Sequence, residues 1–455
     1  MIEITIQNMI DACRGTWQGD PALLDARPEN IVTDSRQAGP GSLFIALKGE
    51  RTDGHKYIPD VLAKGALAVL CQEPGDGGEP RILVPDVMQA MREIAACVRG
   101  RCAYPFIGVT GSVGKTTAKE MIAAVLSARY DTFKTPGSMN GQIGLPVTFM
   151  ALSARYEAAV IEMGISQFGE MTRLTEMVRP DYAVFTNIGD AHLEFLRDRE
   201  GVLRAKSEIV RGMKHDAVIF ANGDDALLKK ADFGRKTVLF GLGENCTVRA
   251  EDLSSRDGIS LQCTVCAPGR RFAADIPAYG EYIIYSVLAA TAVGMELGLS
   301  NEEIARGLRA YNTVGHRSRV VRSPLCTLID DCYNANPTSN RAAIDSMVRL
   351  PGRKVCFLGD MREMGETSPR LHREIGEYAV ERGVDLVCTY GEEAKHIAEG
   401  AGERGRHFTD RRQLLDSIEG ILRPGDVVLV KASHGPNFVD IVEKIEELQK
   451  KNAES

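Results

Sequence analysis

The sequence contains no apolar run long enough to cross a membrane and no surplus of positive charge. Its longest uncharged run, YIIYSVLAATAVGM at residues 282–295, falls short of the ~20 residues that a membrane span needs, so it predicts a buried helix. Lys and Arg together number 55 against 62 Asp and Glu, which gives a formal net charge of -7. A chain without a basic face is not expected to bind nucleic acid or to insert into an anionic membrane.

A disulfide framework and a secretion signal are also missing. The eleven cysteines are scattered along the chain, and an odd number without regular spacing predicts reduced thiols and a cytoplasmic protein. The start, MIEITIQNMIDAC, has no basic segment followed by an apolar block, so no signal peptide is expected. Cys263 and Cys266 form the one CxxC pair, which fits either half of a zinc site or a strand. We favour a strand, because no second pair or nearby His completes a zinc site.

The composition is that of an ordinary globular protein, with 44% hydrophobic and 26% charged residues. A chain of 455 residues is too long for one hydrophobic core, and its pattern predicts three α/β domains. Residues 1–103 carry short apolar runs, SLFIAL and GALAVLCQ, broken by Gly, Asp and Pro, which predicts a small N-terminal α/β domain. Residues 104–312 alternate strand-like runs (FIGVT, AAVIEMG, DYAVFTNIG) with amphipathic helices, which predicts a central P-loop ATPase-type parallel sheet.

Residues 313–455 repeat this alternation in four strand-like runs: TLIDDCYN, KVCFLGDM, DLVCTYG and DVVLVKAS. Each run ends in polar or small residues, as expected at the ligand-facing edge of a doubly wound sheet. A C-terminal Rossmann-like domain is therefore predicted, and the stretch DIVEKIEELQKK within it is predicted to be helical.

The most specific motif is TGSVGKTT, between the strand FIGVT and the helix KTTAKEMIAAVLSARY. It is a variant of the Walker A loop, GxxxxGK[ST], because Val109 occupies the position of the first Gly. In such a loop the backbone N–H groups face phosphates, Lys115 reaches the outer phosphates, and the Thr116 hydroxyl is a magnesium ligand. The alternative, a plain Gly-rich turn, does not need Lys followed by two Thr. The residues expected to hold the nucleotide are Gly111, Ser112, Gly114, Lys115, Thr116 and Thr117.

Two further polar side chains stand at predicted strand ends. Glu162 follows the apolar run AAVI, and His192 lies just beyond the strand that ends in FTNIG. A carboxylate and an imidazole near a triphosphate would suit magnesium held through the outer phosphates. Each residue also has a structural interpretation: Glu162 as an ordinary strand-end carboxylate, and His192 as a helix cap or a core histidine. Together with the phosphate loop, the metal-binding interpretation is the more persuasive one.

Several segments resemble the Mur ligases of peptidoglycan synthesis, over nearly the whole chain. Residues 33–58, TDSRQAGPGSLFIALKGERTDGHKYI, are similar to the N-terminal domain that holds the UDP end of the substrate. TGSVGKTT, TPGSMNGQIGLPVT, VIEMG, NIGDAHLEFL and RAKSEI resemble the family's central ATPase domain in order and spacing. DDCYNANPTSNRAAID and LGDMREMGETSPRLHREIG look most like the members that add D-alanyl-D-alanine to UDP-N-acetylmuramoyl-tripeptide.

The resemblance implies an ATP-dependent amide ligase whose substrates are UDP-N-acetylmuramoyl-tripeptide and D-alanyl-D-alanine. The terminal carboxylate of the tripeptide would attack the γ-phosphate of ATP, which gives an acyl phosphate and ADP. The amine of the dipeptide would then attack the acyl phosphate and release phosphate. This chemistry needs positive charge around the triphosphate, so ATP and two magnesium ions are expected. A monomer is expected, because three domains can close around the substrates.

The resemblance also implies roles for individual residues. Lys206 would be carbamylated and serve a second magnesium ion, with a solvated helix lysine as the alternative. Arg317 would reach the phosphates from the third domain, so the domains are expected to close. The catalytic set would be Lys115, Asn140, Glu162, His192, Lys206 and Arg317, with magnesium on Thr116, Glu162, His192 and Lys206. The third domain would add Asp331, Asn334 and Asn336 at its ATP-facing edge, and Ser35, Arg36, Lys48, Asp53, Gly54 and His55 would line the UDP end. Outside the family, DSR and DGH are simply turn formers.

Two departures from the family pattern leave alternatives open. Relatives carry HNxxN at the start of a helix near adenine, whereas this chain has Tyr282 and Tyr285 there, so a tyrosine is expected to stack on adenine. GHR replaces the more usual PGR around Arg317. These changes keep open a paralogue that joins a different amine, a depsipeptide or a single amino acid, and also a nucleotide-binding regulator without turnover. The retained phosphate and magnesium residues argue against the regulator.

Overall fold

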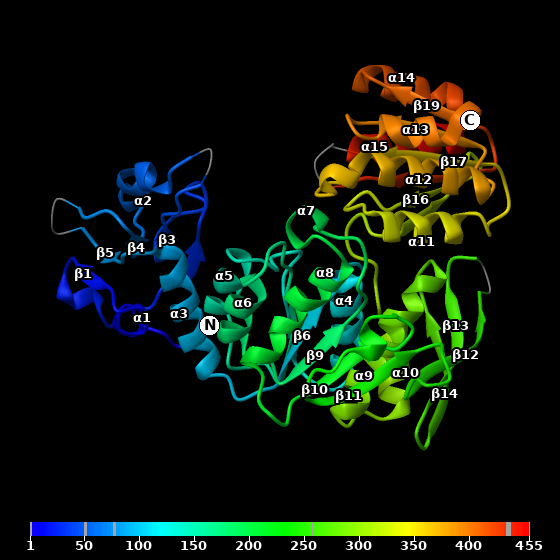
Figure 1. Cartoon of the computed structure of the whole chain (residues 1–455). Helices are drawn as coiled ribbons and strands as arrows, with labels where there is room; N and C mark the ends of the chain where they lie inside the picture. Colours follow the sequence, from blue (N-terminus) through cyan, green and yellow to red (C-terminus); the bar gives the residue numbers. More distant parts are fainter. Residues whose placement is uncertain (1, 50–51, 76–78, 256–257, 434–437, 455) are drawn as a thin grey trace.

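Three β-sheets, each built from one continuous stretch of chain, organise the computed structural model (Figure 1). The structure describes residues 2–49, 52–75, 79–255, 258–433 and 438–454. In Figure 1 the N-terminal domain (blue) lies to the left of the central domain, and the C-terminal domain (yellow to red) lies to its upper right. The predicted three-domain α/β architecture is confirmed.

The N-terminal domain is a small α/β unit. Its elements are α1 (Ile6–Cys13), β1 (Thr16–Gln18), β2 (Asn30–Val32), β3 (Ser42–Ile45), α2 (Ile58–Ala63), β4 (Ala68–Cys71), β5 (Arg81–Leu83) and α3 (Val87–Gly100). The sheet order is β1-β5-β4-β3-β2, and all neighbours are parallel except β1 and β5. β3 and β4 are buried along their whole length, as the runs SLFIAL and GALAVLCQ predict.

The central domain contains a nine-stranded sheet. Its strands are β6 (Phe106–Thr110), β7 (Thr132–Lys134), β8 (Ala158–Glu162), β9 (Tyr182–Phe185), β10 (Val218–Asn222), β11 (Lys236–Gly241), β12 (Val248–Ser254), β13 (Leu261–Ala267) and β14 (Arg270–Ile276). The order is β14-β13-β12-β11-β10-β9-β6-β8-β7, and the pairs from β7 to β12 are parallel. The predicted parallel sheet is thus confirmed except at one edge, where β12, β13 and β14 pair antiparallel. Cys263 and Cys266 lie within β13, so their interpretation as strand residues is confirmed.

Helices cover both faces of this sheet. They are α4 (Lys115–Leu126), α5 (Gly144–Met150), α6 (Glu170–Val178), α7 (Leu193–Leu196), α8 (Arg199–Ser207), α9 (Ile284–Glu296) and α10 (Asn301–Arg309). α9 is the buried helix predicted from the long uncharged run, and its Val287 and Leu288 share a hydrophobic core with Met121 and Val125 of α4. Within the described residues, no helix has the length and apolarity that a membrane crossing requires.

The C-terminal domain contains the third sheet, in the order β15-β16-β20-β17-β18-β19. Its elements are β15 (Arg319–Arg322), β16 (Cys326–Asp330), α11 (Pro337–Met347), β17 (Lys354–Gly359), α12 (Ser368–Glu381), β18 (Leu386–Tyr390), α13 (Lys395–Ala401), β19 (Gly405–Phe408), α14 (Arg411–Ile421), β20 (Asp426–Lys431) and α15 (Val439–Glu454). All pairs are parallel except β15 with β16. The four predicted strands and the helix α15 are therefore confirmed.

Candidate active site

The phosphate loop leaves the end of β6 and turns into α4. Gly111 has a φ of 149° and Gly114 a φ of 79°, backbone conformations that favour glycine. A Cβ on Gly111 would lie 1.9 Å from the Thr186 hydroxyl, so no side chain fits at this position. The Val113 N–H donates to Asn187 Oδ1 at 2.9 Å, which ties the loop to the segment after β9. These constraints hold the N-terminus of α4 at the carboxyl edge of the sheet, where it attracts anions.

The side chains of Lys115 and Ser112 form hydrogen bonds with nearby backbone carbonyls. The Lys115 ammonium donates to the backbone carbonyls of Gly111 at 2.8 Å and Ser112 at 3.3 Å. Desolvation lowers the pKa of Lys115 from its ordinary value. The Ser112 hydroxyl donates to the Gly189 carbonyl at 3.2 Å, and Thr117 lies within hydrogen-bonding reach of Tyr311. The ammonium therefore already stands over the loop carbonyls, close to where the loop N–H groups would receive phosphate oxygens.

Glu162 is the centre of the polar cluster beside the loop. It ends β8, pairs in register with Val109 of β6, and its side chain is almost fully buried. The Thr116 hydroxyl donates to the two carboxylate oxygens at 3.0 Å and 2.9 Å. The Asn140 amide donates to Oε1 of the same carboxylate at 2.6 Å. Three of the predicted site residues, Thr116, Asn140 and Glu162, are thus in direct contact.

Lys206 lies in α8 and is completely buried. Its ammonium has no hydrogen-bond partner among the described residues, and its pKa lies well below the ordinary value, first through desolvation and then through the charge of Lys115. The interpretation of Lys206 as a solvated helix lysine was therefore wrong, because that position is closed to solvent.

His192 takes part in a contact between two domains. It precedes α7 with a φ of 56°, and its Nδ1 pairs with the carboxylate of Glu363, which itself has a φ of 59°. This contact lowers the pKa of Glu363, chiefly through the hydrogen bond to the imidazole. The Glu194 N–H also donates to the Glu363 carbonyl at 3.4 Å. In this arrangement His192 joins the central domain to the loop after β17.

Arg317 approaches the phosphate loop from the C-terminal domain. Its guanidinium stacks 3.6 Å from the centre of the Tyr333 ring, and its charge contributes to the lowered pKa of Lys115. The Tyr333 hydroxyl in turn hydrogen-bonds with the Ser138 hydroxyl of the central domain. The charge of Arg317 thus acts on Lys115 across the domain boundary, and their meeting at one phosphate stays a prediction.

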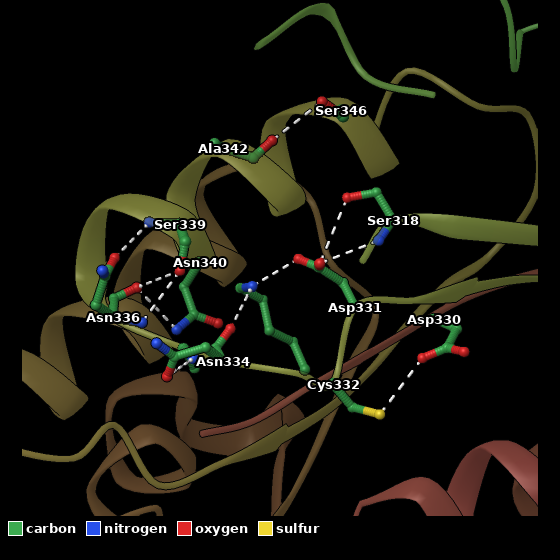
Figure 2. A network of polar contacts seen from close by, with 12 residues as sticks. Ser318, Asp330, Asp331, Cys332, Asn334, Asn336, Ser339, Asn340, Ala342 and Ser346 are labelled. Atoms are coloured by element: carbon green, nitrogen blue, oxygen red, sulfur yellow. Dashed lines mark hydrogen bonds and ion pairs between the residues drawn. The ribbon is translucent and has the colours of Figure 1, made fainter. Parts of the chain in front are cut away.

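A polar network follows the ends of β16 and β20 (Figure 2). Figure 2 shows Asp331 facing Ser318, whose N–H donates to Asp331 Oδ1 at 3.1 Å. The other Asp331 oxygen accepts from Lys431 at 2.5 Å, and Lys431 also donates to the Asn334 carbonyl at 2.9 Å. Asn336 caps α11 by accepting from the Ser339 N–H at 2.8 Å. The Asp331 carboxylate is thus neutralised by a nearly buried lysine, and the Asn336 side chain serves the helix.

The tyrosine that stands at the start of α9 also reaches this network. The Tyr282 hydroxyl hydrogen-bonds with the Ser318 hydroxyl across the domain boundary. Burial raises the pKa of Tyr282 well above its ordinary value. Tyr285 follows in α9 and its pKa is raised to about 12, mainly by desolvation. Tyr282 therefore contacts the C-terminal domain, whereas the groups that shift the pKa of Tyr285 besides desolvation are Asp224 and Cys246 of the central domain.

The predicted UDP-binding residues lie in the N-terminal domain, far along the chain from the phosphate loop. Asp53 accepts from the His55 backbone N–H at 3.0 Å and pairs with His55 Nδ1 at 2.7 Å. The remaining His55 nitrogen accepts from the Gln72 N–H at 3.0 Å. The Gly54 N–H donates to the Leu47 carbonyl at 2.8 Å. A Cβ on Gly54 would lie 2.8 Å from the Leu47 nitrogen, which is too close for a side chain. DGH thus forms a tightly packed, capped turn.

Lys48 and the DSR segment lie in the same domain. Lys48 forms an antiparallel bridge with Asp53. The Arg36 guanidinium donates three hydrogen bonds to the Asp34 carboxylate, at 2.6, 2.9 and 3.1 Å, and they lower the pKa of Asp34 to about 2. The Ser35 carbonyl accepts from Lys64 at 3.2 Å. Arg36 itself is largely exposed, which leaves it accessible from solvent.

Two buried lysines stand beside the predicted site residues. Lys431 ends β20 and holds Asp331, as described above. Lys119 lies one helical turn beyond Lys115 in α4 and is fully buried against Glu162 and the segment after β7. Its only signal in the sequence is a charged residue on the apolar stripe of KTTAKEMIAAVL.

The fold and the site define a nucleotide-binding α/β protein with a phosphate loop and three domains. Family models match along the chain: the Mur ligase family, catalytic domain at residues 28–99, the Mur ligase middle domain at 109–294, and the Mur ligase, glutamate ligase domain at 316–434. The chain belongs to the Mur ligase family.

Relatives and solved structures agree with this assignment over the whole chain. The UDP-N-acetylmuramoyl-tripeptide--D-alanyl-D-alanine ligase of Bacillus subtilis is 36% identical, with 98% of this chain and 99% of the relative covered. The ligase of the same name from Escherichia coli is 33% identical, with the same shares covered. The crystal structure of MurF from Acinetobacter baumannii is similar with a TM-score of 0.89 at 30% identity, covering 98% of each chain. MurF ligase from Thermotoga maritima in complex with ADP has a TM-score of 0.85 at 30% identity, covering 93% of this chain and 98% of that one.

Proposed function

We propose that this protein is an ATP-dependent ligase that joins D-alanyl-D-alanine to UDP-N-acetylmuramoyl-tripeptide in peptidoglycan precursor synthesis. The observation that carries the proposal is the contact of Thr116 and Asn140 with the buried Glu162 carboxylate, directly beside the phosphate loop. A plain nucleotide-binding turn does not need this cluster. The names and full-length similarity of the relatives, and the ADP in one similar structure, support the same reaction.

The chain's own residues have distinct tasks in this reaction. Lys115 and Arg317 face the triphosphate from two domains and offset the repulsion between it and the substrate carboxylate. That carboxylate attacks the γ-phosphorus, the bond to the bridging oxygen breaks, and ADP leaves. The neutral amine of the dipeptide then attacks the acyl carbon, loses a proton and expels inorganic phosphate. Asn140 would stand near the transferred phosphate, where its amide can donate to a phosphate oxygen once it leaves Glu162.

The donor set around Glu162 fits magnesium. A hydroxyl and a carboxylate are hard oxygen ligands, and Thr116 and Glu162 bring both to one point beside the loop. Bound magnesium would withdraw negative charge from the phosphate oxygens. His192 is held by Glu363 through Nδ1, so its Nε2 is the nitrogen that would serve as a ligand.

We further propose that Lys206 is carbamylated. Its amine is buried without a hydrogen-bond partner among the described residues, and desolvation lowers its pKa, which favours the neutral form that reacts with carbon dioxide. The reaction forms a nitrogen–carbon bond and releases a proton, which leaves a carboxylate-like group. Such a group would replace an orphaned amine by two hard oxygen atoms, suited to a second magnesium ion.

The remaining assignments complete the proposal. Residues 1–103 would bind the UDP end through Ser35, Arg36, Lys48, Asp53, Gly54 and His55. Residues 104–312 would bind ATP, and residues 313–455 would bind the amine and supply Asp331, Asn334 and Asn336 at the ATP-facing edge. We propose a monomer in the cytoplasm, where ATP is available and where the eleven free thiols remain reduced.

One experiment tests the reaction directly. Purified protein, ATP, magnesium and UDP-N-acetylmuramoyl-tripeptide are mixed with a panel of amines, and phosphate release and the mass of the product are measured. Release with D-alanyl-D-alanine alone, together with the pentapeptide product, supports the proposal. Release with another amine assigns the protein to a different specificity. Bound ATP without release for any amine would make it a regulator and overturn the proposal.

A further inference from the structure

Lys119 is a cation that the reaction described so far does not use. It is fully buried in α4, where a charge without partners would be costly. Its ammonium donates to the backbone carbonyls of Thr135 and Gly137, each at 2.8 Å. It also lies 3.0 Å from a Glu120 oxygen and 3.6 Å from Glu162 Oε2. The two carbonyls fix the ammonium, and the two carboxylates receive its charge.

The partners of Lys119 also hold the cluster formed by Thr116, Asn140 and Glu162 in place. The carbonyls belong to the segment that runs from β7 towards Asn140, whose amide contacts Glu162. The Thr135 hydroxyl accepts from the Glu162 backbone N–H at 3.0 Å, so the same segment also holds the end of β8. Lys119 thereby connects α4, the Asn140 segment and the Glu162 carboxylate at a single point.

The charge of Lys119, like its hydrogen bonds, is directed at particular partners. Glu120 already has Lys134 at 2.5 Å on its other oxygen, and Lys134 is about half exposed. By contrast, Lys119 is the cation that forms an ion pair with Glu162 among the described residues. Loss of the ammonium would leave two carbonyls without a donor and a buried carboxylate without a counter-charge, and Glu162 and Asn140 would then move.

We propose that Lys119 is a positioning residue for phosphoryl transfer, which holds the Glu162 carboxylate and the Asn140 segment in the arrangement that faces the phosphates. The inference rests on the proposed function. A residue behind the ligands orients them without touching the substrate, and its removal weakens both metal use and turnover.

The test compares Lys119→Met with Lys119→Arg and with the control Lys134→Met, which removes the neighbouring cation that does not contact Glu162. For Lys119→Met we expect kcat to fall roughly 10- to 100-fold and the magnesium concentration for half-maximal rate to rise by a similar factor. KM for the UDP-substrate should stay close to that of the wild type. Lys119→Arg should restore part of both values, and Lys134→Met should behave as wild type.

A binding measurement separates this inference from the reaction itself. The rise in unfolding temperature caused by magnesium and ATP should shrink in Lys119→Met and persist in Lys134→Met. If the wild type released no phosphate with any amine, the proposed reaction would be refuted. The thermal-shift comparison would still test whether Lys119 supports the binding of magnesium and ATP. If Lys119→Met does not fold, Lys119→Met/Glu120→Gln, which removes the charge together with one of its partners, takes its place. A folded variant with wild-type kcat, magnesium dependence and thermal shift would overturn the inference.

Discussion

The Thr116 hydroxyl donates to both oxygens of the Glu162 carboxylate, at 3.0 Å and 2.9 Å, although the two residues come from α4 and β8. The parallel pairing of β6 with β8 brings them together, because it places Val109 and Glu162 side by side at one sheet edge. The phosphate loop and Glu162 are therefore held in one fixed arrangement, and a substitution in either should disturb the position of the other.

Thr116→Val tests this unit with almost no change in volume. The variant loses the hydroxyl that contacts Glu162, so we expect kcat to fall by about 100-fold, with a higher magnesium requirement. Phosphate release at increasing magnesium measures both effects. Thr148→Val is the matched control, since that buried hydroxyl donates to the Gly144 carbonyl within α5. Equal rates for the two variants would remove Thr116 from the site.

Lys115→Ala should abolish turnover without unfolding the protein. Among the described residues, the hydrogen bonds of the desolvated ammonium go to the Gly111 and Ser112 carbonyls, so its loss should not lower the unfolding temperature. We expect kcat to drop by at least roughly 100-fold, because the cation nearest the loop is missing. Assays of phosphate release measure kcat, and thermal unfolding followed by circular dichroism measures the unfolding temperature. A variant with normal turnover would rule out the role given to Lys115.

Lys206→Met should slow the reaction and stabilise the fold. In bicarbonate-free buffer the unfolded lysine has its ordinary pKa of 10.5, whereas the folded lysine has a much lower one, so the unfolded chain binds more protons. The contribution of Lys206 to the free energy of unfolding should therefore rise as pH increases towards 10.5, so the stability advantage of Lys206→Met over the wild type should shrink with rising pH. Denaturant unfolding at several pH values measures the difference.

Bicarbonate provides the second half of the Lys206 test. Removal of bicarbonate should slow the wild type, and added bicarbonate should restore its rate, while Lys206→Met should respond to neither. Mass spectrometry under native conditions should detect the carbamate on the wild type. A wild-type rate for Lys206→Met would contradict the carbamate proposal.

Arg36→Ala tests the assignment of the N-terminal domain. The side chain is largely exposed and its described bonds are to Asp34, so its loss should leave the fold intact. We expect a higher KM for the UDP-substrate, by roughly 10-fold, with KM for ATP and kcat unchanged, since the contact is equal in ground and transition states. Arg412→Ala, an even more exposed arginine in the C-terminal domain, is the control. An unchanged KM would place the UDP end elsewhere.

The sequence predicted those parts of the fold that depend on neighbours along the chain. β6, α4 and the buried α9 follow from short apolar runs and helical spacing, and all three were found. The antiparallel edge of the central sheet was missed, because strand direction depends on the connection. Here β13 and β14 are joined by a tight turn at Pro268 and Gly269, where Gly269 has a φ of 69°.

The candidate site was predictable where a motif marked it. The loop, Glu162 and Asn140 were selected from the sequence, and the structure brings them together. Lys119 was not, because a lysine within a helix is normally exposed, whereas this one is buried where α4 packs against β7 and β8. The pairing of His192 with Glu363 likewise depends on how two domains meet, which no local pattern encodes.

Each sheet draws all of its strands from one unbroken segment: residues 16–83, 106–276 and 319–431. No strand is exchanged between them, so a genetic crossover between β14 and β15 would transplant the whole third sheet without splitting any ladder. Recombination between related genes could in this way substitute the unit proposed to receive the amine and keep the phosphate-handling unit as it stands. A replaced third sheet would have to keep the contacts that join it to the central domain, such as Tyr333 with Ser138 and Glu363 with His192.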